Sequence, residues 1–562
     1  MEVDRSIEEL RAQKRKTKAA MTAWEEYQNS ILMERNASAE QKLRRALRKL
    51  KVIGGEEPVD VISESVYALS RESKRIPSLM SEQKAMLASL LDQFNGPRTF
   101  RSEYLRDKNV ISIFESCLTR TLGISTGSLS TDLIVVKTCY FKILKDIILN
   151  GFFLNGEKYI YFTASAGQIR TKRSVFIRES QLKRYSDKLM CGLSMKKINA
   201  AGGVNTNKYL AYLALCNSAT DPWPEFDIAK TIVVDDMETN VTGVVDYIDG
   251  ATYYIERKKM DVPITHTDGA GMIRLDVSRK NFMIRLPWVK GLLAAFPFDK
   301  FIREANRADP HINHGLVRDI YGVEHDILVE DIQIILFKSQ FKMHKFYNDW
   351  AEYQAYFTTF GCEASICNME PDVFDDAKIN YQMIQTLSDL SDEELWSISE
   401  ETRRRLDTIS TDRSTMLQVF GATKQNPHRS GFQESLLLYP ELLQDEYTRD
   451  TLREIKKSII SEAVSGRLNI NGKYTFLIPD FYAVCQWLFL RDKDPAGLLA
   501  DGEVWCRLFP DAKDLDCLRS PHLYMEHAVR KNRFDDAAEA KRWFVTDGIY
   551  TSCKDLISKI LQ

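Results

Sequence analysis

Residues 281–298, NFMIRLPWVKGLLAAFPF, begin with a strand-like run, NFMIRLP, and continue as an apolar stretch. The apolar stretch, residues 286–298, is the best candidate for a membrane span, but it is too short to cross a bilayer and includes Lys290. Burying an unpaired lysine is costly, so Lys290 is predicted to reach a polar site. Snorkelling of its side chain to the surface is the alternative.

Other strand-like runs surround this stretch. They lie at 157–177, 230–236, 241–248 and 251–259, and Asp-Gly pairs at 249–250 and 268–269 mark turns between them. Short strands at regular spacing indicate a closed or nearly closed β-barrel. Residues 151–340 are therefore predicted to form a barrel with insertions.

The rest of the chain predicts an α+β protein. Residues 1–150 show mainly helical periodicity, including 129–149, and residues 341–465 form a second helical region in which Ser391 and Glu394 fit a capping box. Strand-like texture returns at 466–490 and 504–518, and residues 550–562 are predicted to be a helix. Residues 466–562 are thus expected to begin a second β-rich domain.

The composition excludes several classes of protein. Hydrophobic residues make up 44% of the 562 residues and charged residues 28%, which supports a sizeable core, and the net charge of −2 excludes a globally basic coat. Basic residues still gather locally, nine against two acidic residues in 168–197. The ten dilute cysteines and the charged N-terminus, which has no apolar signal core, predict a cytoplasmic protein with no membrane partner.

Common catalytic signatures are missing from the sequence. There is no phosphate loop, no GxSxG elbow and no HExxH motif. His311 and His314 lie three residues apart without a third ligand nearby in sequence, and Cys362 and Cys367 have no second cysteine pair. No protein-bound metal is predicted from these residues.

Four short motifs suit a polyphosphate or nucleic-acid backbone. Small residues allow close backbone approach, and cations neutralise phosphate charge. Each motif also has a purely structural interpretation, such as a basic hairpin edge, an ordinary helix start or a capping turn. The motifs are FTASAGQIRTKR at 162–173, WVKG at 288–291, KSQFKM at 338–343 and LRSPHL at 518–523.

In this order, and together with DGAGMI at 268–273, the motifs resemble the RNA-silencing RNA-dependent RNA polymerases, most closely their phage, prophage and bacterial relatives. The resemblance covers roughly residues 100–562. It implies two double-psi β-barrels, the first within 151–340 and the second beginning near 466, joined by helices of 341–465 that line a nucleic-acid channel. It also implies an RNA polymerase that uses nucleoside triphosphates, makes an RNA product and copies an RNA or DNA template.

The resemblance assigns roles residue by residue. Lys290 would approach the triphosphate and Arg519, just before a serine and a proline, would read the ribose 2′-hydroxyl; these two are the predicted catalytic residues. Asp268 is expected to serve as a structural turn. The residues expected to contact nucleic acid or triphosphate are Gln168, Arg170, Lys172, Gln340, Lys342 and His522.

One part of the family pattern is absent. The aspartate signature DxDGD, which holds Mg²⁺ in the family, does not occur in the 562 residues. We expect the chain to end just before it, as a split gene product, a truncated reading frame or a fragment. The Mg²⁺ ligands would then come from a missing segment or from a separate C-terminal polypeptide, and the chain alone would be inactive. The alternatives are a catalytically inactive nucleic-acid-binding protein derived from such a polymerase, or a helical scaffold protein.

Overall fold

The computed structural model describes residues 98–100, 115–125, 130–137, 141–164, 173–379, 381–387, 389–423, 426, 429–519, 527–535 and 537–557. This part of the chain divides into two compact units. The first holds 98–100 and 124–185, and the second holds 115–123 and 186–557. No described helix combines the length and the apolar character that a membrane crossing requires.

The first unit is built on a five-stranded sheet. Its order is β1 (Arg98–Phe100), β3 (Phe152–Leu154), β4 (Glu157–Thr163), β5 (Arg173–Arg178) and β2 (Leu133–Lys137). Helix α5 (Phe141–Asn150) contributes Ile147 to a core that also contains Phe152, Tyr159 and Phe176. The rings of Phe152 and Tyr159 stack with centroids 5.3 Å apart. The unit therefore has its own small aromatic core, and the division from the second unit falls within α7 (Glu179–Met190).

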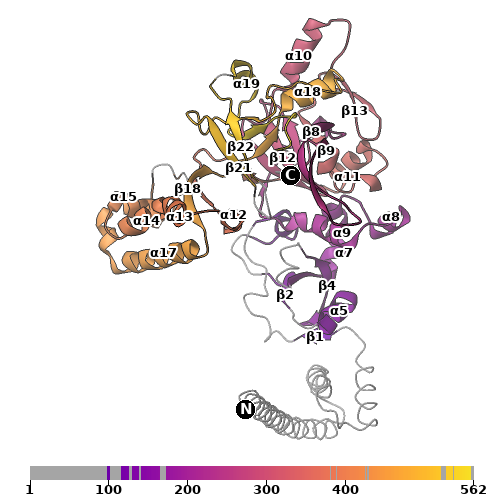
Figure 1. Ribbon diagram of the computed structural model, residues 1–562. Coiled ribbons are helices and arrows are strands. Elements are labelled where there is room, and N and C mark those ends of the chain that lie inside the picture. Colours follow the sequence, from indigo (N-terminus) through magenta and orange to yellow (C-terminus); the bar gives the residue numbers. More distant parts are fainter. Residues whose placement is uncertain are drawn as a thin grey trace, which may run out of the picture. The chain divides into compact units, whose positions relative to one another are not determined.

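The second unit contains a seven-stranded mixed sheet (Figure 1). β12 pairs in parallel with β10 and antiparallel with β11, and β15 pairs in parallel with β7. The buried parallel strands β7 and β15 read as continuous apolar runs, as strands covered on both faces do. The order is β6 (Asp221–Pro222), β16 (Ser365–Met369), β11 (Phe282–Leu286), β12 (Val289–Ala295), β10 (Ala270–Ile273), β15 (Ile334–Phe337) and β7 (Thr231–Val234).

A second, five-stranded sheet lies in the same unit. Its order is β19 (Leu477–Pro479), β23 (Ile549–Thr551), β20 (Glu503–Trp505), β22 (His527–Asn532) and β21 (Asp514–Leu518). One hydrophobic core includes residues of both sheets, among them Met272 and Leu292 from the first and Trp505 and Tyr550 from the second. The two sheets are thus held against each other by shared apolar burial rather than by a linker.

Helices close the edges of this core. In α10 (Phe298–Ala308), Phe298, Phe301 and Ile302 recur at helical spacing and are buried. The Phe301 ring meets Tyr482 of α18 (Phe481–Phe489) at 5.2 Å and Trp543 of α19 (Ala538–Trp543) at 5.8 Å. Other helices of the unit are α4 (Cys117–Thr121), α8 (Met195–Ala200), α9 (Thr206–Leu213) and α11 (Trp350–Thr359).

A helical group lies between the two sheets in sequence, and Figure 1 shows it in orange. It has its own core, which includes Ile409, Leu436 and Leu452. The capping box predicted at Ser391 and Glu394 is present. The group consists of α12 (Tyr381–Thr386), α13 (Asp392–Ile398), α14 (Glu400–Thr408), α15 (Arg413–Val419), α16 (Gly431–Leu438) and α17 (Glu446–Val464), and is flanked by the pair β17 (Asp376–Ile379) and β18 (Leu468–Lys473).

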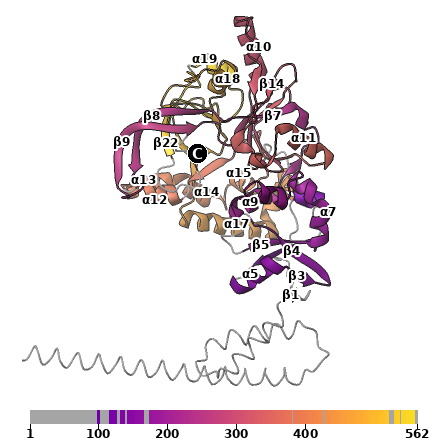
Figure 2. The same ribbon diagram turned by 90° about the vertical axis from the view of Figure 1, so that its right-hand side faces the viewer.

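A long two-stranded ribbon extends from the seven-stranded sheet of the second unit (Figure 2). β8 (Glu238–Ile248) and β9 (Ile255–Thr265) pair along their whole length. Only the base of the ribbon is covered, where Val241 and Ile264 are buried and Gly243 approaches Leu556. A smaller hairpin, β13 (Leu316–Arg318) and β14 (Glu324–Asp326), completes the strands.

The structure confirms the α+β class and differs from the sequence predictions in four places. Strands β3–β5 belong to the first unit and β16 lies beyond residue 340, so the boundaries 151 and 340 are not the ends of the large sheet. Within 129–149, residues 133–137 are a strand because their β-branched side chains pair with β5. Residues 481–489 are helical, since Asp480 caps them, and residues 549–551 form a central strand rather than the start of a helix.

Candidate functional site

Lys290 lies on the hairpin formed by β11 and β12. Leu286 pairs with Val289, so Pro287 and Trp288 alone make the turn. Trp288 has φ +65°, a left-handed backbone conformation that costs a bulky residue of order 1–3 kcal/mol. Such strain persists only where the surrounding contacts hold the turn in place.

Three hydrogen bonds hold this turn. The indole Nε1 of Trp288 donates to the Met190 carbonyl at 2.8 Å. The Tyr353 hydroxyl donates to the Pro287 carbonyl at 2.8 Å, and the backbone amide of Lys342 donates to the Trp288 carbonyl at 2.9 Å. The hairpin that carries Lys290 is therefore fixed by three segments that are distant in sequence.

Lys290 is half-buried among other cations. Burial lowers the pKa of Lys290, the charges of Lys342 and Arg285 lower it further, and only Asp268 opposes them. Arg285 is its cross-strand neighbour. Among the described residues the Lys290 ammonium makes no hydrogen bond or ion pair. An incoming anion would relieve this repulsion and favour the charged lysine.

The alternation of β12 fixes the direction in which Lys290 projects. Residues two apart in a strand share a face, so Lys290, Leu292 and Ala294 lie on one side of the sheet. Leu292 and Ala294 belong to the core shared with Trp505 and Tyr550 of the second sheet. Lys290 therefore emerges at the rim of this core, on the face that the second sheet covers.

Gln340, for which the resemblance implied a nucleic-acid contact, lies inside the sheet. Its side chain is fully buried. Its Oε1 accepts the Phe337 amide at 3.0 Å, and its Nε2 donates to the Leu292 carbonyl at 3.0 Å. A Cβ at Gly271 or Gly291 would lie 2.6 or 2.3 Å from these amide atoms. Two glycines thus make room for Gln340 inside the sheet, where it cannot face a nucleic acid.

The turn at Asp268 and Gly269 is tied to a half-buried carboxylate, Asp236, that no motif singled out. Ser339 donates from its hydroxyl to Asp236 at 2.6 Å and accepts the Gly269 amide at 3.0 Å. Thr267 also donates to Asp236, at 3.0 Å. Burial raises the pKa of Asp236, although the hydrogen bonds from Ser339 and Thr267 act in the opposite direction. Ser339 of the KSQFKM motif therefore has a structural role, since its hydrogen bonds connect this turn to Asp236.

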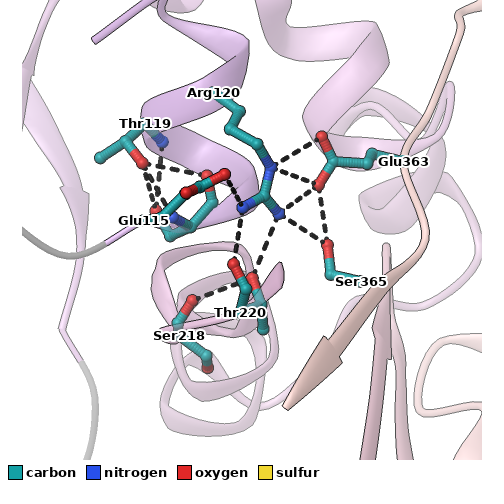
Figure 3. Close-up of polar contacts among 8 residues, drawn as sticks. Glu115, Thr119, Arg120, Ser218, Thr220, Glu363 and Ser365 are labelled. Carbon is teal, nitrogen blue, oxygen red and sulfur yellow. Dashed lines mark hydrogen bonds and ion pairs between the residues drawn. The ribbon is translucent and has the colours of Figure 1, made fainter. Parts of the chain in front are cut away.

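A second polar cluster, centred on Arg120, lies at the β6 and β16 edge of the seven-stranded sheet (Figure 3). Its guanidinium donates to both carboxylate oxygens of Glu363, at 3.0 and 3.1 Å from Nε. It also donates to the Thr220 carbonyl at 2.6 Å, to Glu115 at 3.1 Å and to the Ser365 hydroxyl at 3.1 Å. Arg120 and Glu363 are 243 residues apart, so no local sequence pattern could have paired them.

The remaining predicted site residues divide into two groups. Arg519 is exposed and directly follows β21, an edge strand of the second sheet. The others lie outside the described residues. These are Gln168, Arg170, Lys172 and His522. The structure thus brings Lys290 and Lys342 together, and adds Arg285, which no motif singled out.

The described residues do not fit a magnesium site. No group of three or more His, Cys, Asp or Glu side chains among them could hold a metal ion. His311 and His314 accordingly form no such group in the described chain, and Cys362 and Cys367 are free thiols. Lys290, Lys342 and Arg285, by contrast, are cations, which suit anionic ligands rather than divalent metal ions.

The family model described as "RNA dependent RNA polymerase" matches residues 125–522. This match covers most of the chain. It spans the cationic hairpin, the turn at 268–269 and the seven-stranded sheet, and it ends before β22 and β23 of the second sheet. The chain therefore belongs to the RNA-dependent RNA polymerase family, which confirms the resemblance carried by the motifs.

Individual relatives come from phage, plant and fungal sources. The chain is 50% identical over 493 residues to the DNA-directed RNA polymerase YonO of Bacillus phage SPbeta, covering 88% of this chain and 57% of the relative. It is 28% identical over 264 residues to RNA-dependent RNA polymerase 6 of Arabidopsis thaliana, covering 44% and 20%. The solved RNA-dependent RNA polymerase QDE-1 of Thielavia terrestris matches with a TM-score of 0.46 and 14% identity, covering 89% of this chain and 60% of that one. The chain thus spans little more than half the length of the phage relative.

Proposed function

We propose that this chain supplies the triphosphate-binding side of an RNA polymerase that makes RNA from nucleoside triphosphates. The observation that carries the proposal is the group of Lys290, Lys342 and Arg285 at the rim of the core between two sheets. Burial and mutual repulsion lower the pKa of Lys290, with only Asp268 to oppose them. A triphosphate would supply the missing negative charge.

The proposed roles follow from side-chain chemistry. Lys290 and Lys342 are compact charges suited to phosphate oxygens, whereas Arg519 has a planar fork suited to a ribose 2′-hydroxyl. The two sheets are proposed to belong to the two double-psi barrels of the family. Template and product contacts are proposed for the residues outside the described chain, namely Gln168, Arg170, Lys172 and His522.

Metal ligands have to be supplied by residues other than those described. Mg²⁺ favours carboxylate and water oxygens, and the described residues provide no suitable group. We assign Mg²⁺ binding to a DxDGD segment outside these 562 residues. The residues of this chain are proposed to neutralise the charge of the triphosphate and to position the nucleotide.

DNA is the proposed template. The support is the name of the phage relative, a DNA-directed RNA polymerase, and its 50% identity over 493 residues. The plant relative, an RNA-dependent enzyme, matches at lower identity and over a shorter segment. A nucleic-acid-binding protein without catalysis is the alternative, because the described residues include no carboxylate group able to hold the metal.

Nucleotide binding tests the cationic site directly. Binding of fluorescent GTP to the whole chain should weaken at least tenfold in Lys290→Gln. Lys457 is an exposed lysine on α17 that pairs with Glu454, so Lys457→Gln is the matched control and should bind as the wild type does. Equal affinity of wild type and Lys290→Gln, with both proteins folded, would remove the basis of the proposal.

RNA synthesis tests the complete activity. Labelled nucleotides are supplied with single-stranded DNA or RNA templates, with and without a polypeptide carrying DxDGD. The proposal expects product only with that polypeptide, and more on DNA. Absence of product on both templates, despite template binding, would favour the inactive nucleic-acid-binding protein.

A further inference from the structure

The tip of the ribbon formed by β8 and β9 exposes aromatic side chains that no described part of the unit covers. Tyr253 and Tyr254 are 79% and 70% exposed. Ile248 and Ile255, which form the last pair of the ribbon, are also exposed. Large apolar side chains gathered on a projecting tip mark an interaction site rather than ordinary surface.

Several hydrogen bonds hold the turn at this tip. The Asp249 carboxylate accepts the backbone amides of Ala251 and Thr252 and the Thr252 hydroxyl, at 3.1, 2.7 and 2.7 Å. The Tyr253 amide donates to the Asp249 carbonyl at 2.8 Å, and Tyr253 itself has φ +56°. The two tyrosines are thus presented on an ordered backbone, which reduces the entropy lost when they bind a partner.

Cations follow the tyrosines on β9. Arg257 and Lys259 lie two residues apart and so share one face of the ribbon. Their side chains make no ion pair among the described residues. Lys258, on the other face, lies 3.7 Å from the centre of the Tyr247 ring. An aromatic tip with free cations beside it is complementary to a ligand that has flat rings and a negative backbone.

We infer that the ribbon tip binds an unpaired nucleic-acid strand, with Tyr253 and Tyr254 stacking on bases and Arg257 and Lys259 contacting phosphates. Stacking on aromatic side chains is worth on the order of a tenfold or larger change in affinity per base and does not depend on sequence. The inference rests on the proposed function, which brings a nucleic acid to this chain. It adds a contact outside the nucleotide site.

The test measures binding of the whole chain to a labelled 12-nucleotide single strand and to the same sequence as a duplex, without nucleotides or metal. The double variant Tyr253→Ser/Tyr254→Ser should bind the single strand at least tenfold more weakly and the duplex with little change. Tyr253→Phe/Tyr254→Phe should retain the wild-type affinity, because stacking needs the ring and not the hydroxyl. Phe141→Ser, at an exposed phenylalanine of α5, is the matched control.

The cations have a separate signature. Arg257→Gln/Lys259→Gln should weaken single-strand binding and lower its salt dependence, since each lost phosphate contact removes counterion release. Unchanged single-strand affinity in the tyrosine double variant overturns the inference. So does a loss of self-association in that variant with unchanged nucleic-acid affinity, which would identify a second copy of the chain as the occupant. If the wild type binds neither single strand nor duplex, the proposed function fails as well.

Discussion

Replacing Gln340 distinguishes a buried structural role from the nucleic-acid contact that its motif predicted. In the structure, Gln340 satisfies the Phe337 amide and the Leu292 carbonyl, both at 3.0 Å. Gln340→Ala leaves these two backbone groups buried without that partner. Each such group costs about 1–3 kcal/mol, so we expect a loss of about 2–6 kcal/mol, to which the cavity adds.

Gln340→Met separates the two contributions. Methionine fills most of the volume but forms neither hydrogen bond, so most of the loss should remain. The reverse experiment is Gly291→Ala, whose Cβ would lie 2.3 Å from Nε2 of Gln340 and should also destabilise the sheet. Gln444→Met, at an exposed glutamine after α16, should have almost no effect.

Native-state hydrogen exchange is the appropriate assay because the effect is local to β12 and β15. A loss of 2 kcal/mol or more accelerates exchange of their amides by roughly 30-fold or more, whereas amides of the helical group should be unaffected. Nucleic-acid binding is measured in parallel. If Gln340→Ala exchanges like the wild type but binds nucleic acid more weakly, the buried role is refuted.

Three further predictions concern stability. Lys290→Met should stabilise the unliganded protein by roughly 0.5–2 kcal/mol in chemical denaturation. Because the pKa of Lys290 is lowered in the folded protein, the stability of the wild type should rise as the pH rises towards 10.5. The variant should lack this rise. Burial lowers the pKa of His266 to about 4, so stability should fall by up to about 3 kcal/mol as pH drops from 6.5 towards 4, and His266→Gln should flatten this dependence. Arg120→Met should cost about 2–4 kcal/mol by leaving Glu363 largely buried and without its guanidinium partner, whereas Arg404→Met, which breaks an exposed pair, should cost less than about 1 kcal/mol; equal costs would contradict the buried role.

The sequence predicted those features that depend on local chemistry. The capping box at Ser391 and the helical region that ends near residue 465 follow from periodicity and side-chain hydrogen bonding, and the structure has them. The lysine within the apolar run at 286–298 was also interpretable, because an unpaired ammonium is disfavoured in a core. The ordered motifs carried the family, which the match over 125–522 confirms.

Prediction from the local sequence pattern was wrong where pairing with a distant strand determines the secondary structure. Residues 133–137 satisfy a helical pattern but become a strand, because β5 offers them a ladder of hydrogen bonds. Residues 549–551 likewise become a central strand between β19 and β20. A short apolar run can enter either structure, and its neighbours in space determine which one forms.

The sequence by itself determined which residue types are available to the site: the cations Lys290, Lys342 and Arg285, and no DxDGD aspartates. Tertiary structure decided which of them gather. The cross-strand register places Arg285 beside Lys290. The glycines at 271 and 291 leave space for Gln340, and Arg120 pairs with Glu363, which lies 243 residues away in sequence. The physical reason is that charge repulsion and burial depend on distance in space, which residue order does not specify.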